Sequence, residues 1–284
     1  MSKLHITGIS RGSEYSPNNV GSDSEIFNNV VNALTELGCD VDIYSEKEFV
    51  EKNIQAEIIF DMARDKATIK RLQELEDGGA LVINSAYGIM NCVRKPMTEL
   101  LLKNNVPHPH TVIIDTKEEF CGDFYPCWIK RGNSHTILKE DVTYVTCKEE
   151  AETALADFRN RNISTAVISE HLEGDLIKFY GVQDTDFFYW FYPSHVHSKF
   201  GLEKINGDSQ GYNFDVNELK RISDLAAVAL NTPVYGGDCV VSKDGTVRLI
   251  DFNDWPSFAR CREEAGKKIA ECIYNRAKNH KKQQ

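Results

Sequence analysis

The chain has 284 residues, of which 41% are hydrophobic and 27% charged, and its formal net charge is −10. These values fit a globular protein with one large or two to three small domains. The negative charge argues against nucleic acid or an anionic membrane as partner, although a local basic site for phosphates is still allowed.

The cysteines and the apolar segments indicate in which cellular compartment the protein is expected. The eight cysteines are scattered without a Cys-x-x-Cys pair, which favours reduced thiols over disulfides or a zinc site. No run approaches ~18 apolar residues, and no apolar secretion signal opens the chain. We therefore expect a cytoplasmic protein with no membrane partner.

Strand-like and helix-like segments alternate along the first ninety residues. This alternation predicts a parallel sheet with right-handed crossovers, whose ligands gather at the C-terminal strand ends. Arg11 and Arg64 follow two of those ends, although both would also fit as solvated loop residues. No Gly-x-Gly-x-x-Gly or Gly-x-x-x-x-Gly-Lys motif follows a strand here, which argues against a dinucleotide or P-loop site. The expected strands are Lys3–Ile9, Cys39–Tyr44, Glu57–Asp61 and Ala80–Asn84, and the expected helices are Ser24–Leu37 and Lys66–Glu76.

A lysine ends the next apolar strand, Pro126–Lys130, which follows a helix at Arg94–Lys103 and a strand at Val112–Asp115. A lysine inside an apolar run is costly unless it meets an anion, so Lys130 is predicted to contact phosphate, with snorkelling to solvent as the alternative. The loop that follows offers hydrogen-bonding side chains suited to phosphate: Asn133, Ser134, His135 and Thr136. His135 would also fit as an exposed loop residue.

Two more strands, Ala166–Leu172 and Leu176–Val182, are joined by the linker Glu173–Asp175. The aromatic run over residues 187–192 alternates like a strand and is predicted to pack in the core. After it, His195 and His197 have no third soft ligand nearby, so we expect this loop to contact an anionic acceptor, through Lys199 among others. Helices are expected at Val216–Leu230 and Glu263–Ala277.

A hairpin is predicted between Asp238 and Asp251, because Asp244-Gly245 stands between two apolar runs. It would bring both carboxylates to one end of a sheet, and Asn253 would project on the same side as Asp251. Three hard oxygen ligands suit Mg²⁺, which completes its shell with nucleotide phosphates. The pattern indicates an ATP-using enzyme, although strand-end carboxylates in an ordinary hairpin would look similar.

The segments from Asn84 to Phe258, taken in order, resemble the ATP-grasp superfamily, which includes glutathione synthetase-like carboxylate–amine ligases and D-alanine–D-alanine ligase. In that family an acidic residue on one strand, then an acidic residue and an Asn on the next, hold the metals that bridge the ATP phosphates. Asp251 stands where many members carry Glu, and Ser257-Phe258 where many have glycine.

This resemblance implies an α/β (α+β) fold, with a parallel-sheet pre-ATP-grasp domain followed by a two-subdomain ATP-grasp core. The implied boundaries are residues 1–90, 91–168 and 169–284. It also implies ATP and Mg²⁺ (or Mn²⁺) as cofactors, with Lys130, Lys178 and His135 in catalytic roles. The further implied contacts are Lys95, Lys130 and Lys178 at the phosphates, Glu170 and Leu172 at adenine, Glu173 or Asp175 at the ribose, and Arg11 and Arg64 at the acceptor.

The resemblance favours an ADP-forming ligase that activates a carboxylate as an acylphosphate and joins it to an amine. An alternative is a kinase for a small polyol such as an inositol phosphate. The string Asn133-Ser134-His135 resembles ATP-grasp inositol polyphosphate kinases, and the Arg that many ligases carry is absent between Leu176 and Glu218. A non-catalytic nucleotide-binding module is the third alternative. The expected partner is a small-molecule acceptor, and the oligomeric state is left open, a homodimer included.

Overall fold

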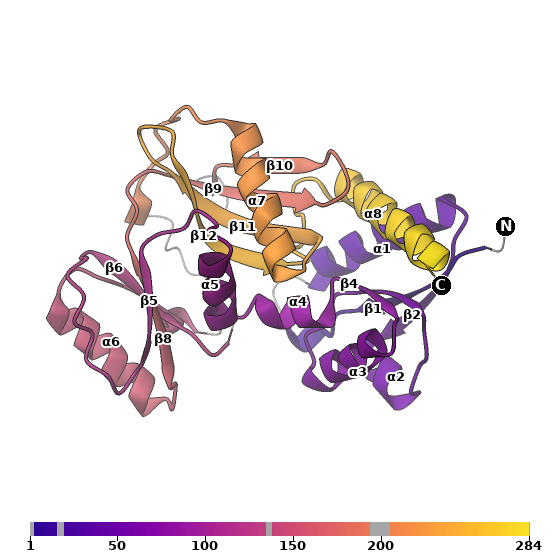
Figure 1. Ribbon diagram of the computed structural model, residues 1–284, viewed down its shortest axis with the longest axis horizontal. Coiled ribbons are helices and arrows are strands. Elements are labelled where there is room, and N and C mark those ends of the chain that lie inside the picture. The colour runs from indigo at the N-terminus through magenta and orange to yellow at the C-terminus, as the bar shows by residue number, and fades with distance from the viewer. Residues whose placement is uncertain (1–2, 16–19, 135–137, 194–204, 284) are drawn as a thin grey trace.

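The computed structural model describes residues 3–15, 20–134, 138–193 and 205–283. Two residues expected at the acceptor, His135 and Lys199, lie outside these ranges. Figure 1 shows three sheets, with the N-terminal and C-terminal helices side by side at one end of the molecule.

The first sheet is parallel and has the strand order β2-β1-β3-β4. Its strands are β1 (His5–Ser10), β2 (Asp40–Ser45), β3 (Ile58–Asp61) and β4 (Leu81–Ile83). The helices of this part are α1 (Val20–Glu36), α2 (Glu46–Glu51), α3 (Lys66–Asp77) and α4 (Ala86–Asn91), with a short 3-10 turn at Ser13–Tyr15. Side-chain caps start three of them: Ser45 and Glu48 form a capping box at α2, Asp65 accepts from the Thr68 N–H at α3, and Ser85 accepts from the Gly88 N–H at α4. The parallel sheet predicted from the sequence is confirmed.

The second sheet is antiparallel, with the strand order β5-β8-β6-β7. Helix α5 (Arg94–Lys103) leads into it and α6 (Lys148–Asn160) covers one face, where Leu155 and Phe158 are fully buried. The strands are β5 (Thr111–Asp115), β6 (Cys127–Arg131), β7 (Val142–Val145) and β8 (Thr165–Glu170), with a 3-10 turn at Lys139–Asp141.

The third sheet is also antiparallel and has the strand order β10-β9-β11-β12. Its strands are β9 (Asp175–Val182), β10 (Phe188–Phe191), β11 (Val234–Val241) and β12 (Val247–Asp254). Helix α7 (Val216–Leu230) packs its apolar side on this sheet and ends at Asn231, whose φ is 58°. The β11–β12 turn contains Gly245 with φ 86°, a conformation that glycine adopts readily. The predicted hairpin is therefore confirmed.

The last helix, α8 (Arg262–Gln283), returns to the first domain and packs along α1 (Figure 1). Gly266 allows the close approach, because a Cβ there would lie 2.7 Å from the Asn29 Cβ. One apolar cluster contains residues of α1, of the parallel sheet and of α8, so the two ends of the chain share a core.

The aromatic strand β10 packs as predicted, with alternating side chains on two faces. Phe187 lies in the cluster shared with α8, while Phe188 and Trp190 pack toward α7. No helix in the described ranges combines the length and apolar character needed to cross a membrane.

Candidate functional site

A cleft of about 590 Å³ opens where the three sheets meet. Its walls come from the second sheet and the linker after β8, its floor from β9, β11 and β12, and one end from the parallel sheet. The lining side chains that carry charge are Arg11, Arg64, Arg94, Lys130, Glu170, Lys178, Asp238, Asp251 and Asp254.

The three predicted metal ligands lie on one face of the β11–β12 hairpin. Asp238 is the cross-strand partner of Asp251, and Asn253 pairs with Gly236 two residues further along. All three ligands line the cleft. The register shifts between Asp238 and Cys239, and such bulges re-aim side chains next to sites. The structure thus places Asp238, Asp251 and Asn253 together, as the hairpin predicted.

Cationic side chains accompany both carboxylates. Lys178 lies opposite Asp238 on β9, and its Nζ is 2.7 and 3.0 Å from the two carboxylate oxygens. Burial alone would lower the pKa of Lys178, but the charge and hydrogen bonds of Asp238 outweigh it and raise that pKa. A guanidinium nitrogen of Arg94 lies 3.6 Å from Asp251. The negative charge of the hairpin is therefore balanced by groups that a cation is able to replace.

The donor set fits Mg²⁺ in chemistry, since it consists of carboxylate and amide oxygens facing an open cleft. Within the described ranges no group of three His, Cys, Asp or Glu side chains gathers as a metal set. The candidate site therefore depends on the Asn253 amide together with two carboxylates, and it leaves room for the waters and phosphates that Mg²⁺ requires.

Lys130 reaches the cleft from β6 and is held in a mostly enclosed position. Its Nζ donates to the Ile250 carbonyl at 3.3 Å. Burial, with Arg94 nearby, lowers the pKa of Lys130 to about 8. A buried ammonium that donates to a neutral backbone carbonyl is a good partner for an incoming phosphate.

The start of α5 presents Arg94 to the cleft, whereas Lys95 points elsewhere. Arg94 is buried and lines the cleft. The Lys95 Nζ lies 3.9 Å from a Glu99 carboxylate oxygen, and its side chain is about half exposed. Its backbone N–H donates to the Gly132 carbonyl in the loop after β6. Sequence reasoning missed Arg94, although the signal was available in two consecutive basic residues at the start of a helix.

The linker between the second and third sheets lines the cleft at the end away from the parallel sheet. The Glu170 carboxylate accepts from the His110 N–H at 2.8 Å and from Arg248 at 3.3 Å. Glu170, His171 and Leu172 all line the cleft. The Leu172 carbonyl accepts from the Asn206 amide at 3.1 Å. The two residues expected at adenine, Glu170 and Leu172, therefore both line the cleft, and their contact with adenine stays a prediction.

An aromatic wall that the sequence analysis missed stands beside this linker. Trp128 Nε1 donates to His171 Nδ1 at 3.1 Å, and burial lowers the pKa of His171, which favours this neutral acceptor. Trp128 precedes Lys130 by two residues on β6, and both line the cleft. Strand alternation, which puts residues two apart on one face, was the available signal.

The two carboxylates expected at the ribose have different surroundings. Asp175 is buried, and its two oxygens accept from the Gln210 and Tyr212 N–H groups at 2.6 and 2.8 Å. Glu173 is exposed. Neither residue is among those that line the cleft. Asp175 secures the segment before α7, and a ribose contact by either residue stays a prediction.

Arg11 and Arg64 line the end of the cleft beside the parallel sheet, and both are engaged by the protein itself. Arg11 donates to Asp23 at 3.0 Å and to the Trp255 carbonyl at 3.3 Å. Arg64 donates to the Asp254 carboxylate at 2.6 Å and to its carbonyl at 3.3 Å. Their predicted contact with an acceptor stays a prediction.

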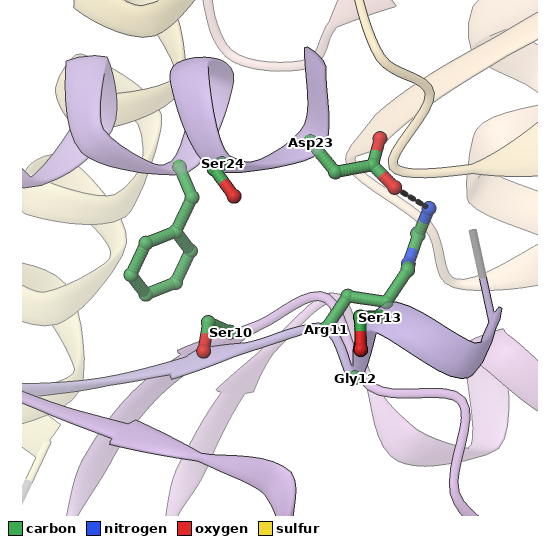
Figure 2. Close-up of a pocket in the computed structure, with 7 residues that line it drawn as sticks. Ser10, Arg11, Gly12, Ser13, Asp23 and Ser24 are labelled. Carbon is green, nitrogen blue, oxygen red and sulfur yellow. Dashed lines mark hydrogen bonds and ion pairs between the residues drawn. The ribbon is translucent and has the colours of Figure 1, made fainter. Parts of the chain in front are cut away.

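Arg11 also lines a second, small pocket of about 30 Å³, together with Ser10, Asp23 and Ser24. Figure 2 shows the Arg11 side chain turned away from Ser10 and toward the Asp23 carboxylate on α1. Nearby, burial and the charge of Asp254 raise the pKa of Asp61 well above its ordinary range, against a hydrogen bond from the Ala63 N–H. Arg11 forms an ion pair with Asp23, and Arg64 forms one with Asp254.

Comparison with solved structures finds the same fold along nearly the whole chain. The D-alanine–D-alanine ligase from Bacillus anthracis matches with a TM-score of 0.66 and 14% identity over 99% of this chain and 100% of that one. The same enzyme complexed with ATP matches with a TM-score of 0.65 and 14% identity over the same shares. The VanG D-Ala:D-Ser ligase from Enterococcus faecalis matches with 0.63 and 13% identity over 97% of this chain and 100% of that one.

No protein-family model matches the sequence, and no curated protein does either. The likeness at these identities is one of fold. It confirms the expected α/β (α+β) architecture, in which an N-terminal parallel sheet is followed by two antiparallel sheets, as the fold shared with D-alanine–D-alanine ligase.

Proposed function

We propose that the protein is an Mg-ATP-dependent, ADP-forming enzyme that activates a substrate carboxylate and joins it to an amine. The observation that carries this proposal is the single cleft in which Asp238, Asp251 and Asn253 face Lys130 and Lys178. Support comes from the fold, which is shared with a ligase whose structure was solved in complex with ATP.

We propose one direction for the nucleotide in the cleft. Its base would lie by the linker, where the Glu170 carbonyl accepts from the adenine amino group, the Leu172 amide donates to the ring, and Trp128 offers an aromatic wall. Its phosphates would then extend along the floor toward Lys130 and Lys178. Mg²⁺, held by Asp238, Asp251 and Asn253, supplies positive charge against the phosphate oxygens. Arg94 takes the phosphate role at the start of α5 that the resemblance gives to Lys95.

The chemistry proposed for this cleft is transfer of the γ-phosphoryl group. A carboxylate oxygen of the acceptor attacks the γ-phosphorus, the bond to the β–γ bridging oxygen breaks, and ADP leaves. An amine then attacks the acyl carbon, phosphate departs, and the amine proton passes to solvent. Lys130 and Lys178 neutralise charge that moves onto the phosphate oxygens, and no side-chain nucleophile is required.

The acceptor occupies the remaining end of the cleft, between the metal ligands and the parallel sheet. Tyr180, Ser257, Arg11 and Arg64 line this end. A hydroxyl acceptor would use the same phosphoryl transfer and would make the protein a kinase. The two chemistries differ in the product: the ligase releases phosphate and forms an amide, while the kinase keeps the phosphoryl group on the acceptor.

The test is ADP release from Mg-ATP with panels of amino acids, peptides and inositol phosphates, followed by mass analysis of the product. Acceptor-dependent ADP with an amide product supports the proposal, and a phosphorylated polyol replaces the ligase with the kinase. The Asp251→Asn variant is the control for contaminating activity. ADP release that is equal in this variant and the wild type would contradict the assigned site.

A further inference from the structure

Three strand ends of the parallel sheet hold the metal-ligand hairpin from one side. Arg11 follows β1, Arg64 lies three residues beyond β3, and Asn84 follows β4. Each donates to backbone at an end of β11 or β12: Arg11 to the Trp255 carbonyl, Arg64 to the Asp254 carbonyl, and Asn84 to the Val234 carbonyl. The first domain is thus bonded to the strands that present Asp238 and Asn253.

The Arg64 contact is the strongest of these three. Its guanidinium lies 2.6 Å from one oxygen of the Asp254 carboxylate and also donates to the carbonyl of the same residue. Asp254 is only 2% exposed. Paired, planar hydrogen bonds of this kind fix orientation as well as distance. Asp254 is covalently joined to Asn253, so the position of Arg64 sets the end of the strand that carries the third metal ligand.

Trp255 shows that this strand end is held in a constrained conformation. Its φ is 36°, in the left-handed region that tryptophan rarely adopts. Its ring is buried in the core of the first domain, with its centroid 6.1 Å from that of Phe60. Its carbonyl accepts from Arg11, and its N–H donates to the Val234 carbonyl. Conformations of this type persist where the surroundings determine them and are common next to functional sites.

The charges of this region are already balanced without an acceptor molecule. Arg11 is paired with Asp23, and Arg64 with Asp254. A ligand anion that bound these arginines would therefore compete with buried carboxylates of the protein. The geometry favours a role in which the arginines act on the hairpin.

We propose that Arg64, with Arg11 beside it, is a positioning residue that acts through Asp254 and Trp255 to orient Asn253 toward the metal. The parallel-sheet domain would then contribute to metal binding without supplying a ligand. This inference rests on the metal site of the proposed function, and it gives Arg64 a different role from direct contact with an acceptor.

The experiment measures ADP affinity by calorimetry, once with saturating Mg²⁺ and once with EDTA. The ratio of the two affinities reports the metal-dependent part of binding, which a general loss of stability would not change selectively. We expect Arg64→Met and Asp254→Asn each to reduce this ratio by about tenfold or more, the usual effect of removing a group that orients a metal ligand. We expect the affinity in EDTA to stay near the wild-type value.

The double variant Arg64→Met/Asp254→Asn separates positioning from independent effects. Because Arg64 acts through Asp254, the double variant should lose no more of the ratio than either single variant. Asp254→Asn replaces a single oxygen by an amide nitrogen, so this variant still tests the Arg64–Asp254 contact if Arg64→Met does not fold. Lys281→Met is the matched control, since it breaks an ion pair between α8 and Glu57, which precedes β3, at the opposite end of the strand from Arg64.

The outcomes are distinct. An unchanged ratio in both single variants, with the wild type binding Mg-ADP, overturns the inference and leaves the proposed function standing. Failure of the wild type to bind ADP in either condition overturns the proposed function itself.

Discussion

The two ends of the cleft are both lined by charged side chains, yet the charges are used differently. At the end proposed to bind the nucleotide, Lys178 and Arg94 neutralise the hairpin carboxylates, and Lys130 donates to a backbone carbonyl. At the other end, Arg11 and Arg64 hold buried carboxylates and backbone of the protein itself. The first set is suited to exchange partners when a ligand enters, and the second set connects the domains.

The largest effect is expected for Asp251→Asn, which removes one of the two carboxylates of the metal site. Turnover should fall at least about a hundredfold, the loss typical when a group that organises transition-state charge is removed. The unfolding temperature should stay close to that of the wild type, because Asp251 is a cleft residue with one long contact to Arg94. Steady-state ADP release and thermal unfolding check both parts, and near-normal turnover would remove the metal assignment.

Asn84→Ala tests the structural character of the other end. The Asn84 amide donates to the Val234 carbonyl at 2.7 Å and accepts from the Val234 N–H at 2.9 Å, all within the core. Alanine leaves the Val234 N–H without this acceptor, while the carbonyl keeps its bond from the Trp255 N–H, so unfolding should become easier by about 1–3 kcal/mol. Urea denaturation measures this. Asn91→Ala, which removes a single bond to the Leu230 carbonyl, should cost less, and an equal cost would argue against the two-bond clamp.

Lys130 gives the nucleotide end a pH signature. Its pKa is lowered to about 8 by burial and by Arg94, so the free protein loses this charge as the pH rises above that value. Phosphates favour the charged form, and ATP affinity should therefore fall by up to about tenfold per pH unit above pH 8. Calorimetry from pH 7 to 10 measures the slope. Lys130→Met should bind ATP more weakly with a flat profile, and a steep profile in that variant would assign the titration elsewhere.

The smallest expected effect concerns Lys178 in the absence of nucleotide. Its ammonium occupies both oxygens of Asp238 and competes with a cation for them. Lys178→Met should strengthen binding of Mn²⁺ alone several-fold while weakening binding of ATP. Paramagnetic resonance of Mn²⁺ follows the first change, and weaker Mn²⁺ binding in the variant would show that Lys178 does not compete for the site.

The sequence predicted those features that depend on local pattern. Helix α7 and the β11–β12 hairpin follow from apolar spacing and from Asp244-Gly245, and the hairpin by itself brings Asp238 and Asp251 together. Other features depend on contacts between distant segments. The periodicity of a helix does not decide whether Arg94 or Lys95 faces a cleft that α5 only partly forms.

The pairings of the arginines show the same limit. Arg64 donates a hydrogen bond to Asp254, which lies 190 residues further along the sequence. The Asp175 carboxylate accepts hydrogen bonds from backbone N–H groups more than thirty residues away. Such partners are set by how the domains dock, which no local pattern encodes. A carboxylate or guanidinium near a motif was therefore predicted to meet a ligand, whereas the structure gives it a protein partner.

Calorimetric titration of the wild-type protein with ATP, in Mg²⁺ and in EDTA, tests the central claim most directly. We expect one ATP to bind per chain, with higher affinity in Mg²⁺ than in EDTA, and we expect Asp251→Asn to abolish this difference. Absence of binding in both conditions, or binding that Mg²⁺ and Asp251→Asn leave unchanged, would contradict the assignment of this cleft as an Mg-ATP site.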